Sequence, residues 1–261
     1  MQKHKILLVE DSIAIQEAIQ SAIQNELNIE VEAVRTKNAT RQILQSSRQD
    51  FFLAILDLNL PDSPQGGVVD MVLNAGIPPI ILTSITDGIL RNYMMKKPVI
   101  DYIIKKRQHE IHYLIDTIRR ILENKSRKVL VVDDSSTTRL LVRELLERQF
   151  LTVLEAADGT EGLKILEECR NEICLVITDY NMPNMDGEEF ILKAREKFSR
   201  HDLAIISISA SDESDISVKL LKAGANDFIT KPFSFEEFFC RINQNIDSVA
   251  GYRCLKNTAE S

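Results

Sequence analysis

The 261-residue sequence contains no stretch that approaches the ~20 consecutive apolar residues of a membrane span. Its start, MQKHKILLVE, passes directly into an apolar run that is too short for the core of a signal peptide. Cysteine is scarce: Cys169, Cys174, Cys240 and Cys254 all lie in the second half and form no CxxC pair, which argues against a zinc site or a disulfide framework. We therefore expect reduced thiols and a cytoplasmic protein.

A basic stripe is also missing. The formal net charge is −7, so neither nucleic acid nor an anionic membrane is an expected direct partner. Hydrophobic residues make up 44% of the chain, enough for each of two ordinary domains to bury its own core. Two domains are therefore the preferred organisation.

An internal repeat supports this organisation. The segment 5–12, KILLVEDS, returns at 128–135 as KVLVVDDS. Two further pairs of blocks follow in the same order: AILDLN, which contains Asp57, matches VITDYN, which contains Asp179, and DYIIK matches DFITK. We predict a duplicated domain followed by a helical tail or linker. The expected parts are a divergent first domain at 1–124, a second domain with a well-formed site at 125–247, and the tail at 248–261.

Each copy alternates short β-branched runs with amphipathic stretches at helical spacing, which predicts repeated βα units and a parallel sheet. The expected strands of the second copy are 128–132, 151–156, 173–178, 203–208 and 226–229. The expected helices are 136–148, 159–170, 186–198, 213–223 and 234–247. The first copy has the same pattern of five strands and five helices.

Polar residues follow the predicted strands at the edge where parallel strands end and where ligands bind. In the second copy this edge gathers Asp133, Asp134, Asp179, Ser209 and Lys231. Three neighbouring carboxylates repel one another, and a hard divalent cation such as Mg²⁺ relieves this repulsion. One carboxylate can then attack phosphorus to form an acyl phosphate, while the metal and the ammonium neutralise the phosphoryl oxygens.

This set of residues resembles the response-regulator receiver (CheY-like) family, twice, over nearly the whole chain. The shared features are the acidic pair, the Asp after an apolar strand, a Ser or Thr before a small residue, and Lys-Pro after the fifth strand. The resemblance implies an α/β fold with two doubly wound (βα)5 flavodoxin-like domains. Each would have a five-stranded parallel sheet in the order 2-1-3-4-5.

The resemblance also implies roles for the second copy. Asp179 would be the phosphoacceptor. The ligands of Mg²⁺ would be Asp133, acting mostly through water, Asp134, Asp179 and the backbone carbonyl of Asn181. Ser209 and Lys231 would hold the phosphoryl group, and Phe228 would be the aromatic switch that reshapes the surface of helix four, strand five and helix five. The phosphoryl group would come from a sensor histidine kinase or a phosphotransfer protein.

The first copy keeps a corresponding set. Its expected phosphoacceptor is Asp57, its metal ligands are Glu10, Asp11, Asp57 and Asn59, and its phosphoryl-binding and switch residues are Thr83, Lys105 and Tyr102. Both outcomes stay open for this copy: a second phosphoacceptor, or a degenerate domain that serves for docking or dimerisation, with Tyr102 locked in one state.

The first copy also departs from the pattern. Glu10 replaces an Asp, the loop LPDSPQGG replaces the Met-Asp-Gly form, and Lys106 stands where Pro232 follows the second lysine. Asp57 and Thr83 are 26 positions apart, against 30 for Asp179 and Ser209, so we expect a shortened loop or helix turn near the pocket.

The output of such a pair has three candidate forms. In the first, the chain is a phosphotransfer module that acts by binding a partner. In the second, it is the truncated regulatory segment of a diguanylate cyclase, because the tail resembles a coupling helix to a downstream effector and no cyclase domain is in the chain. In the third, it is a scaffold without phosphorylation. The resemblance also predicts a homodimer through helix four, strand five and helix five of the second domain. The chain itself is expected not to be an enzyme.

Overall fold

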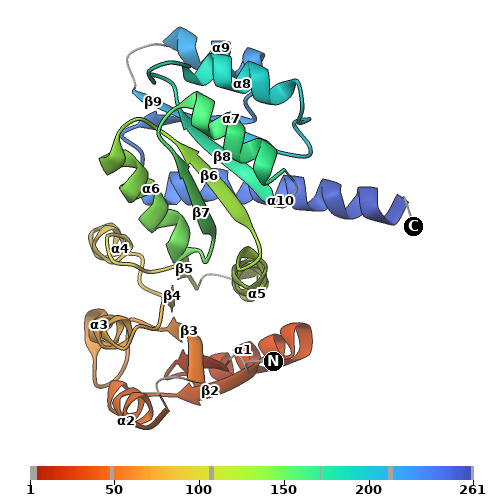
Figure 1. Cartoon of the computed structure of the whole chain (residues 1–261). Coiled ribbons are helices and arrows are strands. Elements are labelled where there is room, and N and C mark those ends of the chain that lie inside the picture. The colour runs from red at the N-terminus through yellow and green to blue at the C-terminus, as the bar shows by residue number, and fades with distance from the viewer. Residues whose placement is uncertain (1–4, 48–49, 106–108, 171, 211–213, 260–261) are drawn as a thin grey trace. The chain divides into compact units, whose positions relative to one another are not determined.

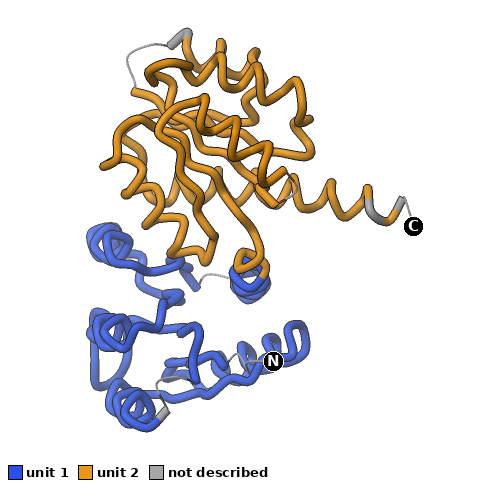
Figure 2. The backbone as a smooth tube through the Cα atoms, in the orientation of Figure 1, with its two compact units in different colours: residues 1–122 blue, residues 123–261 orange. Residues whose placement is uncertain are grey.

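The computed structural model describes residues 5–47, 50–105, 109–170, 172–210 and 214–259 (Figure 1). The chain divides into two compact units, Met1–Leu122 and Glu123–Ser261, which are termed unit 1 and unit 2 (Figure 2). Among the described residues, none of the helices combines the length and the apolar character that crossing a membrane requires.

Unit 1 contains one parallel sheet in the order β2-β1-β3-β4-β5. Its strands are β1 Lys5–Val9, β2 Glu30–Val34, β3 Phe51–Leu56, β4 Pro79–Thr83 and β5 Asp101–Ile104. Its helices are α1 Ile13–Leu27, α2 Lys37–Ser47, α3 Gly67–Asn74, α4 Gly88–Met95 and α5 His109–Asn124, with a short 3₁₀ turn, η2, at Pro64–Gly66.

Unit 2 repeats this architecture, with a parallel sheet in the order β7-β6-β8-β9-β10. Its strands are β6 Lys128–Val132, β7 Thr152–Ala156, β8 Ile173–Asp179, β9 Ala204–Ala210 and β10 Asp227–Lys231. Its helices are α6 Ser136–Arg148, α7 Gly159–Glu168, α8 Gly187–Arg195, α9 Ser214–Ala223 and α10 Phe235–Ala259. Both sheets have the predicted order, so the predicted fold class is confirmed.

The central strands are continuous apolar runs because helices cover both faces of each sheet. In unit 2 one core cluster joins the sheet to α6 and α10 through side chains such as Leu145, Phe238 and Ile242. A second cluster on the other face joins it to α7, α8 and α9 through Leu166, Phe190 and Leu220. Burial on both faces therefore fixes the strands, and with them the edge where their carboxyl ends meet.

Helix α10 takes in nearly all of the predicted helix 234–247 and most of the predicted helical tail or linker 248–261, and it passes through residue 247 without a break. Ile246 and Val249 are buried in the core of unit 2. Farther along, the Tyr252 ring stacks on His201 with 4.8 Å between centroids. Arg253 donates hydrogen bonds to the carbonyl oxygens of Asp202 at 2.7 Å and Ile173 at 2.9 Å. The end of α10 is thus attached to the amino-terminal ends of the strands of unit 2.

Candidate functional site

In unit 1 the predicted polar residues meet at the carboxyl edge of the sheet. Val9 and Leu56 are register partners on β1 and β3, so Glu10 and Asp57, the next residues, leave adjacent strands side by side. The Asp57 N–H bonds to the Val9 carbonyl at 2.9 Å, which fixes this arrangement. Lys105 follows β5, and its backbone N–H donates to the Thr83 carbonyl at 2.8 Å.

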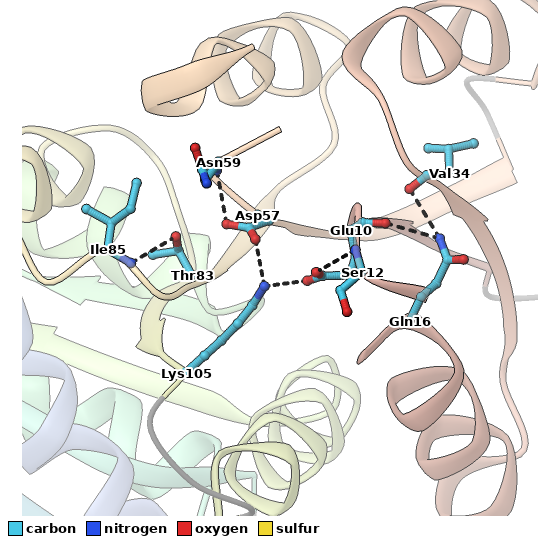
Figure 3. A network of polar contacts seen from close by, with 9 residues as sticks. All are labelled: Glu10, Ser12, Gln16, Val34, Asp57, Asn59, Thr83, Ile85 and Lys105. Atoms are coloured by element: carbon cyan, nitrogen blue, oxygen red, sulfur yellow. Dashed lines mark hydrogen bonds and ion pairs between the residues drawn. The ribbon is translucent and has the colours of Figure 1, made fainter. Parts of the chain in front are cut away.

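The Lys105 ammonium lies between the two buried acids (Figure 3). Its Nζ is 2.7 Å from Asp57 Oδ2 and also forms an ion pair with Glu10 Oε2. The second oxygen of each acid accepts a backbone N–H: Glu10 Oε1 from Ser12 at 3.2 Å, and Asp57 Oδ1 from Asn59 at 3.0 Å. Each carboxylate therefore contacts the Lys105 ammonium through one oxygen and a backbone N–H through the other.

The carboxylates of unit 1 form a group that fits a divalent cation. Single oxygens of Glu10, Asp11 and Asp57 lie within 4.8 Å of one another. Glu10 and Asp57 are buried, and Asp11 is exposed. Burial raises the pKa of Glu10, the Lys105 ammonium opposes this shift, and the nearby Asp57 charge adds to it. An all-oxygen set with excess negative charge is the donor chemistry that Mg²⁺ prefers.

Two hydroxyl groups of unit 1 are joined through one backbone residue. Thr83 Oγ1 accepts a hydrogen bond from the Ile85 N–H at 3.3 Å, and the Tyr102 hydroxyl donates to the Ile85 carbonyl at 3.2 Å. Tyr102 is buried, with the Arg91 guanidinium 5.8 Å from its ring centroid. Burial also raises the pKa of Tyr102, so its hydroxyl stays a donor. The two predicted switch residues are therefore structurally connected.

In unit 2 the equivalent residues also meet at the carboxyl edge. Asp133 and Asp134 follow β6, Asp179 ends β8, and Lys231 ends β10. The Lys231 Nζ is 2.6 Å from Asp179 Oδ1 and 3.6 Å from Asp133 Oδ2. Ser209 is buried next to the end of β9, on the strand that hydrogen-bonds to β8 and β10.

Charge repulsion and burial both act on the acids of unit 2. Burial raises the pKa of Asp133, and the charges of Asp179 and Asp134 add to the shift, while the Ser135 N–H and Lys231 oppose it. Asp133 Oδ1 accepts the Ser135 N–H at 2.8 Å. The excess of carboxylates over ammonium groups again fits a cation site.

The loop after Asp179 is shaped by close backbone contacts. The Asn181 N–H donates to Asp179 Oδ2 at 2.9 Å, and the Gly187 N–H donates to the Tyr180 carbonyl at 2.8 Å. A Cβ at Gly187 would lie 2.3 Å from the Asp179 carbonyl oxygen, so only glycine fits here. The Lys231–Pro232 peptide is cis, and Lys106, at the corresponding position of the first copy, lies outside the described residues.

The expected shortening of unit 1 near the pocket is wrong. The connection between α3 and β4 covers 75–78, whereas the one between α8 and β9 covers 196–203. Both connections precede a strand and lie at the opposite edge of the sheet from the site. The loop that follows Asp57 is longer than the one that follows Asp179, because α3 begins at Gly67, ten positions after Asp57, and α8 begins at Gly187, eight after Asp179.

Two residues that sequence reasoning missed also border the sites. Gln16 Nε2 donates to the carbonyl oxygens of Glu10 at 3.4 Å and Val34 at 3.3 Å. Arg139 occupies the equivalent place in unit 2 and donates to the Asp133 carbonyl at 2.6 Å. The repeat could have identified both residues, because each stands four positions after the serine that ends the matched first block.

The two aromatics predicted to act as switches differ between the units. Tyr102 is buried and hydrogen-bonded through its hydroxyl, whereas Phe228 is half-buried and packs against the core cluster that includes Leu130 and Met182. Phe228 has no hydroxyl with which to form the equivalent bond. The two positions therefore hold their rings by different contacts.

Comparisons with known proteins identify a family for part of the chain. Residues 129–243 match the family model described as response regulator receiver domain. A chemotaxis protein CheY homolog from Campylobacter jejuni is 39% identical over 108 residues, which cover 41% of this chain and 82% of that protein. The two-component response regulator-like APRR7 from Arabidopsis thaliana is 33% identical over 118 residues, covering 45% of this chain and 16% of that protein.

A solved structure resembles both units together. It is described as a two-component system response regulator/GGDEF domain protein and is 38% identical to this chain, with a TM-score of 0.81. The alignment covers 95% of this chain and all of that one. The tandem arrangement therefore has a counterpart of known structure.

Proposed function

The chain belongs to the response regulator receiver family and so serves in two-component response regulation, and on this premise we propose that unit 2 accepts a phosphoryl group on Asp179. The observation that carries the proposal is the Lys231 ammonium 2.6 Å from Asp179 Oδ1, beside the buried Asp133. This supports a site in which a nucleophile, a cation for phosphoryl oxygens and acidic metal ligands share one edge of the sheet.

The transfer would use the residues of unit 2 as follows. An Asp179 oxygen attacks phosphorus of a phosphohistidine in a sensor kinase or phosphotransfer protein; the P–O bond forms, the P–N bond breaks, and the imidazole leaves with the bonding pair and takes up a proton. Lys231 turns from the Asp179 carboxylate to the phosphoryl oxygens, and Ser209 donates its hydroxyl to them. Mg²⁺, held by Asp133, Asp134, Asp179 and the Asn181 carbonyl, supplies charge neutralisation when bound.

The response would arise where these residues join the rest of unit 2. Ser209 is a register partner of Thr230 on β10, two residues beyond Phe228. Movement of Ser209 toward a phosphoryl group opens space for Phe228 to move inward. The surface formed by α9, β10 and α10 then changes and becomes the one that a partner, or a second copy of the chain, recognises.

Unit 1 would be the second phosphoacceptor, on Asp57. Its proposed metal ligands are Glu10, Asp11, Asp57 and the Asn59 carbonyl, and its phosphoryl-binding and switch residues are Thr83, Lys105 and Tyr102. The grouping of three carboxylate oxygens within 4.8 Å supports this proposal.

Intact mass spectrometry tests both acceptors. The chain is incubated with Mg²⁺ and acetyl phosphate beside the variants Asp179→Ala and Asp57→Ala. Two phosphate additions, each removed by its own substitution, are expected. One addition that is lost only in Asp179→Ala would leave unit 1 as a docking or dimerisation module. No addition with any small phosphodonor would refute the phosphoacceptor proposal.

A second candidate is the regulatory segment of a diguanylate cyclase. The similarity to a response regulator/GGDEF domain protein over 95% of the chain favours it, together with the long helix α10. In this proposal the receivers occupy 1–124 and 125–247, and 248–261 couples them to an effector domain. The length of the parent open reading frame decides it: a stop codon directly after Ser261 would refute the cyclase form.

A further inference from the structure

The two acid clusters hold their lysines differently. In unit 1, Lys105 Nζ forms ion pairs with both Glu10 and Asp57. In unit 2, Lys231 Nζ donates a hydrogen bond to Asp179 at 2.6 Å and forms a longer ion pair, at 3.6 Å, with Asp133. The lysine of unit 1 thus closes a bridge between two of the carboxylates that would bind the metal.

The length of the first acid explains this difference. In each unit one oxygen of that acid accepts the N–H of the serine two residues later: Ser12 in unit 1 and Ser135 in unit 2. The other oxygen is left for the lysine. Because Glu10 has one more methylene than Asp133, its free oxygen extends one bond length farther and reaches the ammonium.

Burial strengthens the bridge of unit 1. The Lys105 side chain is 15% exposed and that of Glu10 is 2% exposed, compared with 32% for Lys231 and 7% for Asp133. Ion pairs that are less accessible to water are less screened, and removing one partner leaves a buried charge behind. A cation that enters unit 1 must therefore displace a better-held ammonium.

We propose that Glu10 is a positioning residue that sets the order in which the two receivers respond. By holding Lys105 between Glu10 and Asp57, it makes unit 1 bind Mg²⁺ more weakly than unit 2, so unit 1 is phosphorylated only at higher Mg²⁺ concentration. One additional charged hydrogen bond that must be exchanged corresponds to a roughly ten- to hundredfold weaker affinity. The link from metal affinity to phosphorylation rests on the proposed phosphoacceptor function, whereas the difference in affinity does not.

The test exchanges the two acids in the full chain, one site at a time. Unit 2 is silenced by Asp134→Asn with Asp179→Asn, and Glu10→Asp is then introduced into unit 1. Unit 1 is silenced by Asp11→Asn with Asp57→Asn, and Asp133→Glu is introduced into unit 2. Isothermal titration calorimetry measures the Mg²⁺ affinity without phosphodonor, and intact mass with acetyl phosphate measures labelling over a Mg²⁺ series.

We expect Glu10→Asp to tighten Mg²⁺ binding by about tenfold or more and Asp133→Glu to weaken it by a similar factor. The Mg²⁺ concentration for half-maximal labelling should move with the affinity. The control Glu30→Asp shortens an acid on β2 that pairs with Lys5, and it should change neither value.

Unchanged affinities, or shifts of the same sign in both exchanges, would overturn the inference. Opposite affinity shifts without any phosphate addition would support it while refuting the phosphoacceptor function. Phosphorylation of both sites at equal Mg²⁺ concentration would refute the inference while supporting the phosphoacceptor function.

Discussion

Replacing Arg253 by Met tests how firmly the last turns of α10 are attached to unit 2. Methionine keeps much of the aliphatic side chain and removes the guanidinium, which donates to the carbonyls of Asp202 and Ile173. A hydrogen bond from a charged donor contributes roughly 1.5–3 kcal/mol, and about 1 kcal/mol is reasonable for each at this half-buried site. The loss should therefore total about 2 kcal/mol.

Amide hydrogen exchange measures this loss locally. Because 1.4 kcal/mol corresponds to a factor of ten, amides beyond Gly251 should exchange about 30-fold faster in Arg253→Met. Amides near Ile242 and Ile246 should be unaffected, since these side chains are buried in the core of unit 2. The matched control is Lys256→Met, whose ammonium lies 3.9 Å from Asp202 and is half-exposed, so about a twofold change is expected. Unchanged exchange beyond Gly251, or equal acceleration along the whole helix, would refute the reasoning.

Two further predictions concern the sites. Tyr102→Phe removes the hydrogen bond to the Ile85 carbonyl and should lower the free energy of unfolding of unit 1 by about 1 kcal/mol, as measured by urea titration; an unchanged midpoint would contradict it. Because burial raises the pKa of Asp133 above its unfolded value, its ionised form weakens folding at neutral pH. Asp133→Asn should therefore raise the melting temperature in EDTA and reduce the additional rise caused by Mg²⁺. A lower melting temperature in EDTA would contradict this prediction, because the contacts of Asp133 would then stabilise unit 2 more than its buried charge destabilises it.

The sheets and the placement of the site residues could be predicted from the sequence for a simple physical reason. Asp57 and Asp179 each end an apolar run, and parallel strands bring their carboxyl ends to a common edge. Once the runs were assigned, the convergence of Asp133 and Lys231 on Asp179 followed from chain direction alone. No fine detail of packing was needed.

A helical tail after residue 247 was predicted, but that it joins the preceding helix as one continuous α10 could not be predicted in this way. Gly251 has a poor helix propensity, so local sequence supports the last turns only weakly. They are held instead by Tyr252 on His201 and by Arg253 on Asp202, contacts between residues about 50 positions apart. The helical spacing of Ile246, Val249 and Tyr252 does not show these tertiary contacts, which support the last turns where propensity is weak.

The ion pair between Lys105 and Glu10 was also beyond sequence reasoning. Replacement of Asp by Glu reads as a conservative change, and only the positions of the strand ends show that one methylene brings the carboxylate to the ammonium. The position of the four-residue difference between the units is a similar case. A count between Asp57 and Thr83 cannot say on which side of the intervening helix the residues are missing.

The attachment of α10 gives β8 and β9 a mechanical role. The Ile173 carbonyl at the start of β8 and the Asp202 carbonyl just before β9 hold Arg253, while Asp179 and Ser209 lie at the far ends of the same two strands. Six residue steps separate the ends of β8, which is about 20 Å of extended backbone. Extended strands within a sheet resist stretching, so an axial shift at the Asp179 end must displace the anchors of α10 in the same direction. Helix α10 is thus coupled to the site through the length of the sheet as well as through the surface beside Phe228.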